Sequence, residues 1–266
     1  MLLDISGLTL DYRSRGGRTR ILDGVHLSVE RGETIGLVGE SGSRKSSTAR
    51  AALRLLDDTA ELTGSVRICD TDVAAADARQ LRRIRSHDVG FIQQDPRAAL
   101  NPVRRIGDSL TERLVHVHRI SPREARALGL ELLTVVGISR PEQRMRQYPH
   151  ELSGGMLQRV VIAACLTTRP KLLFADEATS ALDATTQAEV LALLRTLRAE
   201  RDLGILFITH DLHLAAAYCD RVYVMYRGRI VEELSGGDLF DGAQEPYTRS
   251  LLSAVPTLTR VKETIR

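Results

Sequence analysis

The sequence predicts an α/β fold that combines a core around a parallel sheet, a small antiparallel β lobe and an inserted α-helical subdomain. Strand-like runs at 35–38, 171–174 and 204–208 each lead into glycine or polar residues, which is typical of parallel strands whose carboxyl ends carry a site. Short alternating patterns near the N-terminus predict the β lobe, and a helical pattern over 106–146 predicts the helical subdomain.

The composition is that of a globular protein. With 266 residues, 43% of them hydrophobic, the chain can bury a sizeable core. The net charge of +3 is small, and arginines are spread along the chain without interleaved aromatic residues, so we expect no nucleic-acid partner. Three isolated cysteines (Cys69, Cys165 and Cys219) indicate a reduced, cytosolic compartment. No apolar run is long enough for a membrane span and no signal-peptide layout is present, so any membrane role is expected to be peripheral.

The β lobe begins with two alternating segments, 2–12 and 21–29, which predict an antiparallel hairpin that turns over 13–20. Tyr12 lies at the end of the first segment. It is either a strand residue with a hydrated hydroxyl or an aromatic surface on which a purine ring stacks. A further strand over 64–72 is expected to close the lobe.

A glycine-rich turn between a strand (35–38) and a helix (47–56) is the most informative stretch of the chain. It carries Gly39, Lys45 and Ser46 at the spacing G-x-x-x-x-G-K-[ST], with Arg44 in place of the second glycine. Backbone N–H groups in such a turn surround a polyphosphate, while the lysine reaches its oxygens and the hydroxyl reaches Mg²⁺. Seven of the eight motif positions fit this chemistry.

The middle of the chain alternates further strands and helices. A helix is expected over 77–85, followed by a buried strand over 89–92 that stops at Gln94, a residue able to contact a metal or a water. Pro102 prevents the strand from resuming. The helical block over 106–146 contains an N-cap at Ser121 with Pro122 and Glu124 behind it. Ser153, Gly154 and Gly155 form another helix N-terminus that can hold an anion.

Two carboxylates, Asp176 and Glu177, follow the strand over 171–174. Adjacent residues on a strand point opposite ways, so one acid is expected to hold Mg²⁺ while the other faces the attacking water. After a helix over 188–198 comes a strand over 204–208 with His210 at its end, either a structural histidine or part of the site. A hairpin over 221–232, turning at Arg227 and Gly228, and a short helical tail complete the chain.

Taken together, these motifs resemble the ATP-binding cassette (ABC) ATPases, the nucleotide-binding subunits of ABC transporters, over about residues 1–256. The most specific element is Leu-Ser-Gly-Gly-Met-Leu-Gln-Arg at 152–159, which resembles the family's signature loop, placed shortly before a Walker B-like run at 172–177. The other matches are the adenine-stacking position (Tyr12), the Q-loop (Gln94), the D-loop (180–183) and the switch histidine (His210). The resemblance implies a P-loop NTPase core with a helical subdomain at about 95–168 and a tail at 257–266.

The resemblance also implies residue roles. Glu177 would be the general base, His210 would sense the γ-phosphate, and Gln94 would be a further catalytic residue. Ser46, Gln94 and Asp176 would form the Mg²⁺ environment. The residues that would contact ATP are Tyr12, Gly39, Glu40, Ser41, Gly42, Ser43, Arg44, Lys45, Ser46 and Ser47, and, toward the ATP of a second ABC ATPase subunit, Ser153, Gly154, Gly155, Gln158 and Asp183.

A branch of the family is indicated by two segments, 94–102 and 245–256, which resemble the oligopeptide, dipeptide and nickel importers. That branch usually has histidine where Glu245 stands. The implied partners are a second ATPase subunit, two membrane permease subunits and, indirectly, an extracytoplasmic solute-binding protein. The implied location is the cytoplasmic face of the inner membrane.

Two function classes stay open at this point. The chain is either an ATP-hydrolysing subunit that energises import of small peptides, nickel or a chelated metal, or a hydrolysis-impaired structural subunit, which Arg44 favours. A non-transport ABC ATPase, acting on DNA or ribosomes, is not favoured. Such proteins have either two cassettes in one chain or a long coiled coil between the phosphate loop and the signature, and this sequence shows neither.

Overall fold

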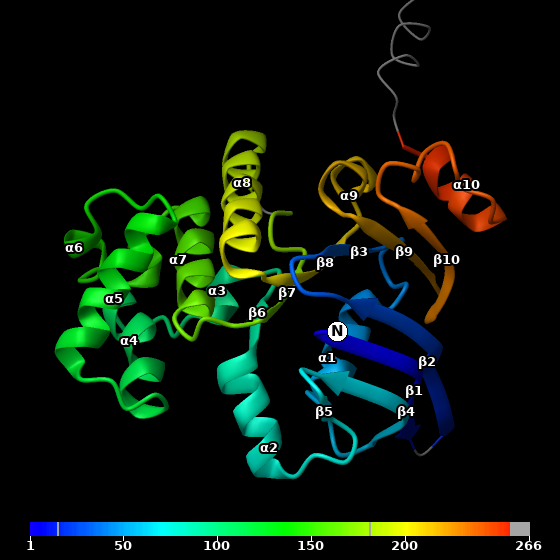
Figure 1. Cartoon of the computed structure of the whole chain (residues 1–266), viewed down its shortest axis with the longest axis horizontal. Coiled ribbons are helices and arrows are strands. Elements are labelled where there is room, and N and C mark those ends of the chain that lie inside the picture. Colours follow the sequence, from blue (N-terminus) through cyan, green and yellow to red (C-terminus); the bar gives the residue numbers. More distant parts are fainter. Residues whose placement is uncertain (15, 181, 256–266) are drawn as a thin grey trace, which may run out of the picture.

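Two sheets and a block of helices make up the computed structural model, which describes residues 1–14, 16–180 and 182–255 (Figure 1). The tail expected at 257–266 lies outside the described residues, as do Arg15 in the first turn and Ala181 in the D-loop. The helices α4 to α7 lie at one end of the molecule, and the β lobe and α10 lie at the other (Figure 1).

The β lobe is a four-stranded antiparallel sheet in the order β2-β1-β4-β5. Its strands are β1 (Leu3–Ser14), β2 (Gly17–Val29), β4 (Ala60–Ile68) and β5 (Thr71–Asp72). The hairpin expected at the N-terminus is confirmed, although both strands are longer than expected. The single strand expected over 64–72 is wrong: it begins at Ala60 and breaks after Ile68, because Cys69 and Asp70 adopt positive φ angles of 47° and 69°.

The core sheet has six strands in the order β10-β9-β3-β8-β7-β6. They are β3 (Thr34–Val38), β6 (Val89–Ile92), β7 (Leu172–Asp176), β8 (Gly204–Thr209), β9 (Arg221–Tyr226) and β10 (Arg229–Ser235). All pairs are parallel except β9 with β10, which form the expected hairpin. The parallel strands therefore end at one edge, where Gly39, Gln94, Glu177 and His210 follow them.

Side chains of this sheet alternate between two hydrophobic clusters. On β8, Ile205 and Phe207 pack in the cluster that contains α7 and α8, whereas Leu206 and Ile208 pack in the cluster that contains α1 and the β lobe. Both faces are buried, which explains the continuous apolar runs of the sequence.

Helices of the core differ from expectation mainly at their ends. They are α1 (Lys45–Ala52), α2 (Ala78–Arg83), α8 (Ala184–Arg201), α9 (Leu212–Tyr218) and α10 (Pro246–Ser253). Helix α1 was expected over 47–56 but begins two residues earlier, at Lys45. It ends at Ala52 because Arg54, two residues further on, adopts φ 49°. After α2 the chain continues as a π-helix, Ile84–Asp88.

The helical block is made of α3 (Pro96–Ala99), α4 (Ile106–His116), α5 (Pro122–Val135), α6 (Pro141–Arg144) and α7 (Gly154–Leu166), with a 3₁₀ turn at Pro149–Glu151. The helical pattern expected over 106–146 corresponds to α4, α5 and α6, and α5 ends shortly before Gly137, whose φ is 74°. The Ser121 cap is confirmed as a capping box with Glu124. All five helices fall within 95–168. No helix in the described ranges is long and apolar enough to cross a membrane.

Candidate active site

The phosphate loop joins β3 to α1 at the carboxyl edge of the core sheet. Lys45 is 5% exposed, and its Nζ donates hydrogen bonds to the carbonyls of Gly39 (2.8 Å) and Glu40 (2.9 Å). Burial lowers the pKa of the Lys45 ammonium, while the nearby carboxylates of Glu177 and Asp176 oppose that shift. The loop therefore places one buried cation among backbone groups at a helix N-terminus, which favours an anion.

Arg44 adopts a left-handed conformation, φ 86° and ψ 21°, immediately before α1. Glycine adopts this conformation without cost, whereas other residues pay a steric cost. One reason for glycine at this motif position is that it lets the backbone approach the phosphates closely. The backbone provides a second reason, because the motif places glycine where φ is positive.

Ser46 and Asp176 form the first pair of side chains next to the loop. The Ser46 hydroxyl donates a 2.9 Å hydrogen bond to Oδ1 of Asp176, which is 6% exposed. Burial raises the pKa of the Asp176 carboxyl, and the Glu177 charge adds to this, whereas the Ser46 hydrogen bond opposes it. A hydroxyl and a carboxylate side by side are oxygen ligands of the kind Mg²⁺ takes together with waters and substrate phosphates, so this pair fits that ion.

Glu177 lies between Gln94 and His210. The Gln94 amide donates a 2.6 Å hydrogen bond to Oε2 of Glu177, and Nδ1 of His210 lies 3.2 Å from Oε1. Three loops from β6, β7 and β8 thus converge on one carboxylate. Gln94 hydrogen-bonds to Glu177, and among the described residues no hydrogen bond joins it to Ser46 or Asp176. The three expected metal ligands are therefore not all in direct contact in this part of the chain.

The two acids do point to different partners, but not for the expected reason. The strand ends at Asp176, and Glu177 lies beyond it with φ 48°. The left-handed residue turns the chain, while its N–H donates to the Ile208 carbonyl (2.9 Å). Strand alternation is therefore the wrong explanation. A turn held by β8 separates the two carboxylates.

The signature loop lies against the start of α8 instead of the phosphate loop. Ser153 caps α7 by accepting from the Met156 N–H (3.4 Å), and Asp183 caps α8 by accepting from the N–H (3.0 Å) and the hydroxyl (2.8 Å) of Thr186. A Cβ on Gly155 would lie 2.8 Å from the Thr186 methyl, so glycine is needed there. These residues line a cavity of about 440 Å³ that none of the phosphate-loop residues lines.

Other predicted site residues are placed less directly. Gln158 is 2% exposed inside the helical block, with no hydrogen-bond partner for its Nε2 among the described residues, so it does not face a surface. Tyr12 pairs with Thr19 and Ala60 in the β lobe and is half-buried.

A smaller cavity, about 270 Å³, lies beside the phosphate loop. It is lined by Glu40–Ser43 together with Tyr226, Arg227 and Tyr247, three residues that the sequence did not indicate as part of the site. Tyr247 lies in the segment 245–256, which the sequence relates only to the importer branch.

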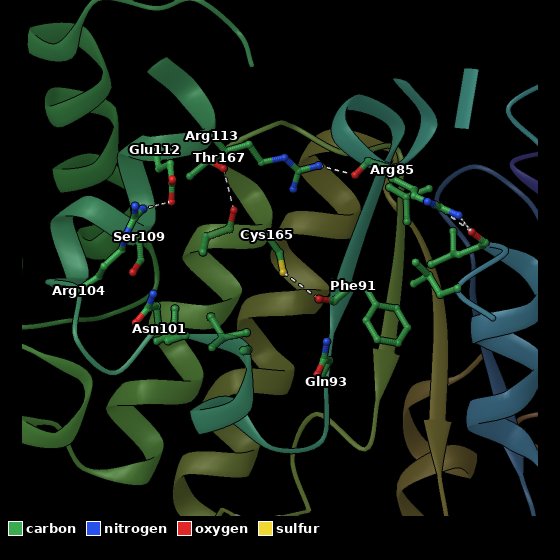
Figure 2. Close-up of a pocket in the computed structure, with 17 residues that line it drawn as sticks. Arg85, Phe91, Gln93, Asn101, Arg104, Ser109, Glu112, Arg113, Cys165 and Thr167 are labelled. Carbon is green, nitrogen blue, oxygen red and sulfur yellow. Dashed lines mark hydrogen bonds and ion pairs between the residues drawn. The ribbon is translucent and has the colours of Figure 1, made fainter. Parts of the chain in front are cut away.

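A larger cavity, about 670 Å³, lies between the core and the helical block (Figure 2). Phe91, Leu100 and Val161 supply apolar lining, and Arg85, Arg104, Glu112 and Arg113 supply charged groups. Arg104 and Glu112 form an ion pair, and the Arg113 guanidinium donates to the Arg85 carbonyl (Figure 2). Gln93 also lines this cavity, next in the chain to Gln94.

Comparisons with known proteins agree with this architecture. The family model described as "ABC transporter" matches residues 22–180. The oligopeptide transport ATP-binding protein OppD of Bacillus subtilis (strain 168) is 42% identical over 259 residues, which cover 97% of this chain and 72% of that protein. The chain spans 43% of the length of OppD of Mycobacterium tuberculosis (strain ATCC 25618 / H37Rv), also 42% identical.

Among solved structures, the ATP-binding cassette MJ0796, in a dimeric post-hydrolysis state bound to ADP and Pi, matches with a TM-score of 0.78 at 28% identity, over 88% of this chain and 98% of that chain. The expected α/β cassette fold is thereby confirmed. On the family model, the identity to OppD and the shared fold, the chain belongs to the ABC transporter family and is one of its ATPase cassettes.

Proposed function

We propose that this chain binds and hydrolyses ATP to energise the import of small peptides through separate membrane permease subunits. The observation that carries the enzymatic part is the Glu177 carboxylate, hydrogen-bonded to Gln94 and close to His210 at the sheet edge that carries the phosphate loop. The choice of peptide over nickel or a chelated metal rests on the relatives named above, which are oligopeptide transport proteins.

In this proposal Lys45 and the loop N–H groups hold the phosphates of ATP. Ser46 and Asp176 would hold Mg²⁺, which would neutralise phosphate charge. Glu177 accepts a proton from the attacking water, while Gln94 and His210 keep its carboxylate oriented. Tyr12 offers a ring to the adenine. Ser153, Gly154, Gly155 and Asp183 face the ATP of a second cassette, because they lie apart from the chain's own phosphate loop.

We place the permease contact at the 670 Å³ cavity (Figure 2). Its apolar and charged lining residues suit a cytoplasmic segment of a permease. Gln93 connects the cavity along the chain to the Gln94 contact with Glu177. The chain would then sit on the cytoplasmic face of the inner membrane, with the extracytoplasmic binding protein as an indirect partner. Ser109→Arg, which fills the cavity, is expected to abolish co-sedimentation with membranes and to leave ATP binding unchanged.

ATP turnover by the purified chain, with and without Mg²⁺, tests the enzymatic part, and uptake of a labelled oligopeptide by cells that carry wild type or Glu177→Gln tests the transport part. A second candidate, a hydrolysis-impaired subunit that pairs with an active paralogue, is favoured by one observation, the strained Arg44 in the phosphate loop. Absence of turnover in the chain alone, restored by a paralogue, would favour it.

A further inference from the structure

The structure assigns Tyr247 the role of a positioning residue that orients the first peptide group of the phosphate loop. Tyr247 belongs to the C-terminal helix α10, and its hydroxyl accepts a 3.3 Å hydrogen bond from the backbone N–H of Glu40. The two residues are 207 positions apart. This inference rests on the proposed ATP-binding function and goes beyond it, since α10 lies outside the part of the chain matched by the family model.

The peptide group between Gly39 and Glu40 is held at both ends. Its carbonyl accepts from Lys45 Nζ at 2.8 Å, and its N–H donates to Tyr247. In a trans peptide the carbonyl and the N–H point in opposite directions, so Lys45 and Tyr247 fix the same plane from opposite sides. When the Lys45 ammonium turns toward a phosphate, Tyr247 still holds this plane.

Glycine is required at the start of the loop because the hairpin backbone passes close by. A Cβ on Gly39, whose φ is 149°, would lie 2.3 Å from the Met225 carbonyl oxygen. Further along the loop, the N–H of Gly228, in the turn between β9 and β10, donates to the Ser43 carbonyl (3.0 Å). The stretch from Glu40 to Ser43 is thus held at Glu40 by α10 and at Ser43 by the hairpin, with the 270 Å³ cavity between them.

Tyr247 is itself well anchored. Its ring packs on Tyr226, with centroids 4.1 Å apart, and Arg227 lies over the Tyr226 ring. The Glu245 carboxylate caps α10 by accepting from the N–H groups of Tyr247 (2.6 Å) and Thr248 (3.2 Å). Burial raises the pKa of the Tyr247 hydroxyl above its ordinary value of 10.0, and its oxygen accepts the Glu40 N–H.

The segment before α10 is fixed to the core sheet. The Glu232 carboxylate of β10 accepts from the N–H groups of Gln244 (2.7 Å) and Glu245 (3.2 Å). A continuous set of contacts therefore runs from β10 through the α10 cap to the phosphate loop. Glu245, where the resembled branch usually has histidine, is an effective cap residue in this chain.

The test is Tyr247→Phe, which keeps the ring stack and removes the hydroxyl. We expect the Glu40 amide to exchange with solvent faster in hydrogen exchange measured on the nucleotide-free chain. We also expect KM for ATP to rise about two- to tenfold, the range for one net hydrogen bond, with kcat within about twofold of wild type. The control is Tyr223→Phe, whose hydroxyl accepts from the Ser28 N–H and the Arg221 guanidinium instead of from the loop. It should change neither quantity.

The two arms distinguish failures. Unchanged Glu40 exchange in Tyr247→Phe overturns the positioning role whatever the chain does with ATP. Faster exchange with unchanged KM shows that the contact exists but does not position the loop for ATP, which also overturns the inference. If Tyr247→Phe and Tyr223→Phe speed Glu40 exchange and raise KM equally, and both lower Tm, the effect is general destabilisation, which overturns the inference. A wild-type chain that neither binds nor hydrolyses ATP overturns the proposed function instead, while the exchange result still decides the contact.

Discussion

The Gln94 amide donates a 2.6 Å hydrogen bond to the Glu177 carboxylate, although the two residues are 83 positions apart. The contact joins the end of β6, which leads into the helical block, to the end of β7 in the core. A movement of the helical block relative to the core would act on Glu177 through this bond. Gln94 is therefore suited to couple the position of the helices to the orientation of the carboxylate.

Glu177→Gln is expected to lower ATP turnover by about 10²–10⁴-fold, because it removes a positioned general base. ATP affinity should be nearly unchanged, since Lys45, Ser46 and Asp176 remain. Steady-state turnover and equilibrium binding of ATP check this. Glu200→Gln, at an exposed position on α8, is the control and should behave as wild type. Wild-type turnover in Glu177→Gln would assign the base elsewhere.

Ser153→Arg is expected to block ATP-driven dimerisation while the monomer still binds ATP. The reason is that Ser153 lines a cavity apart from the chain's own loop, and an arginine would fill the space for the partner's nucleotide. The measurement is light scattering with ATP in a Glu177→Gln background.

Loss of the helix cap has to be separated from this steric effect. Ser153→Ala also removes the acceptor for the Met156 N–H, at a cost of about 1 kcal/mol, but adds no bulk. It should still dimerise. If Ser153→Arg dimerises as well, the composite site formed by two chains is refuted.

Asp11 is expected to make the β lobe sensitive to acid. Its side chain is 2% exposed. Its Oδ1 accepts a hydrogen bond from Nε of Arg20 at 3.2 Å, and its Oδ2 forms an ion pair with the Arg18 guanidinium at 2.8 Å. The Arg20 hydrogen bond, with the charges of both arginines, lowers the pKa of the Asp11 carboxyl despite the opposing effect of burial. A lowered folded-state pKa means that the stabilisation is present above the ordinary value of 3.8 and is lost as pH falls through the folded value.

Thermal unfolding at a series of pH values tests this. Asp11→Asn should have a clearly lower Tm than wild type at pH 7, and the difference should shrink as the pH is lowered below 3.8. Asp58→Asn, at an exposed position for which no ion pair is found in the described ranges, is the control. A difference in Tm that does not depend on pH would mean that the ion pairs contribute nothing.

Most of the architecture followed from local pattern. The apolar runs at 35–38, 171–174 and 204–208 are buried strands, and the glycine-rich turn does join β3 to α1. Element ends were less predictable, because residues such as Cys69, Asp70 and Glu177 adopt positive φ although they are not glycine. The Glu177 N–H donates to the Ile208 carbonyl of β8 and the Cys69 N–H to the Leu2 carbonyl, and a local pattern does not contain such contacts.

The remaining features that the sequence did not predict are contacts between residues far apart in the chain. Nothing near Glu40 in the sequence indicates that Tyr247 accepts its N–H, since that contact depends on how α10 returns to the sheet edge. The proximity of Ser46 and Asp176 was expected only from the order of motifs. Gln158, by contrast, was assigned to the site from its place in the signature, and its burial in α7 argues against direct contact with nucleotide.

The left-handed Arg44 gives the last prediction. Glycine at this position removes a steric cost of about 1–2 kcal/mol. It also adds unfolded-state entropy that costs about 0.5–1 kcal/mol. Arg44→Gly should therefore raise the free energy of unfolding by up to about 1.5 kcal/mol. We expect ATP affinity and turnover to rise as well, because the loop adopts its phosphate-binding geometry without strain.

Two variants separate conformation from charge. Arg44→Ala removes the guanidinium and keeps the strain, so it should not raise ATP affinity. Arg169→Gly relieves a left-handed arginine, φ 49°, far along the chain from the loop, and should raise stability without changing ATP affinity. ATP binding and turnover at equal Mg²⁺ are compared across the set. If Arg44→Gly and Arg44→Ala both bind ATP more weakly than wild type, the strain argument fails, and the Arg44 guanidinium is a working phosphate ligand in this loop.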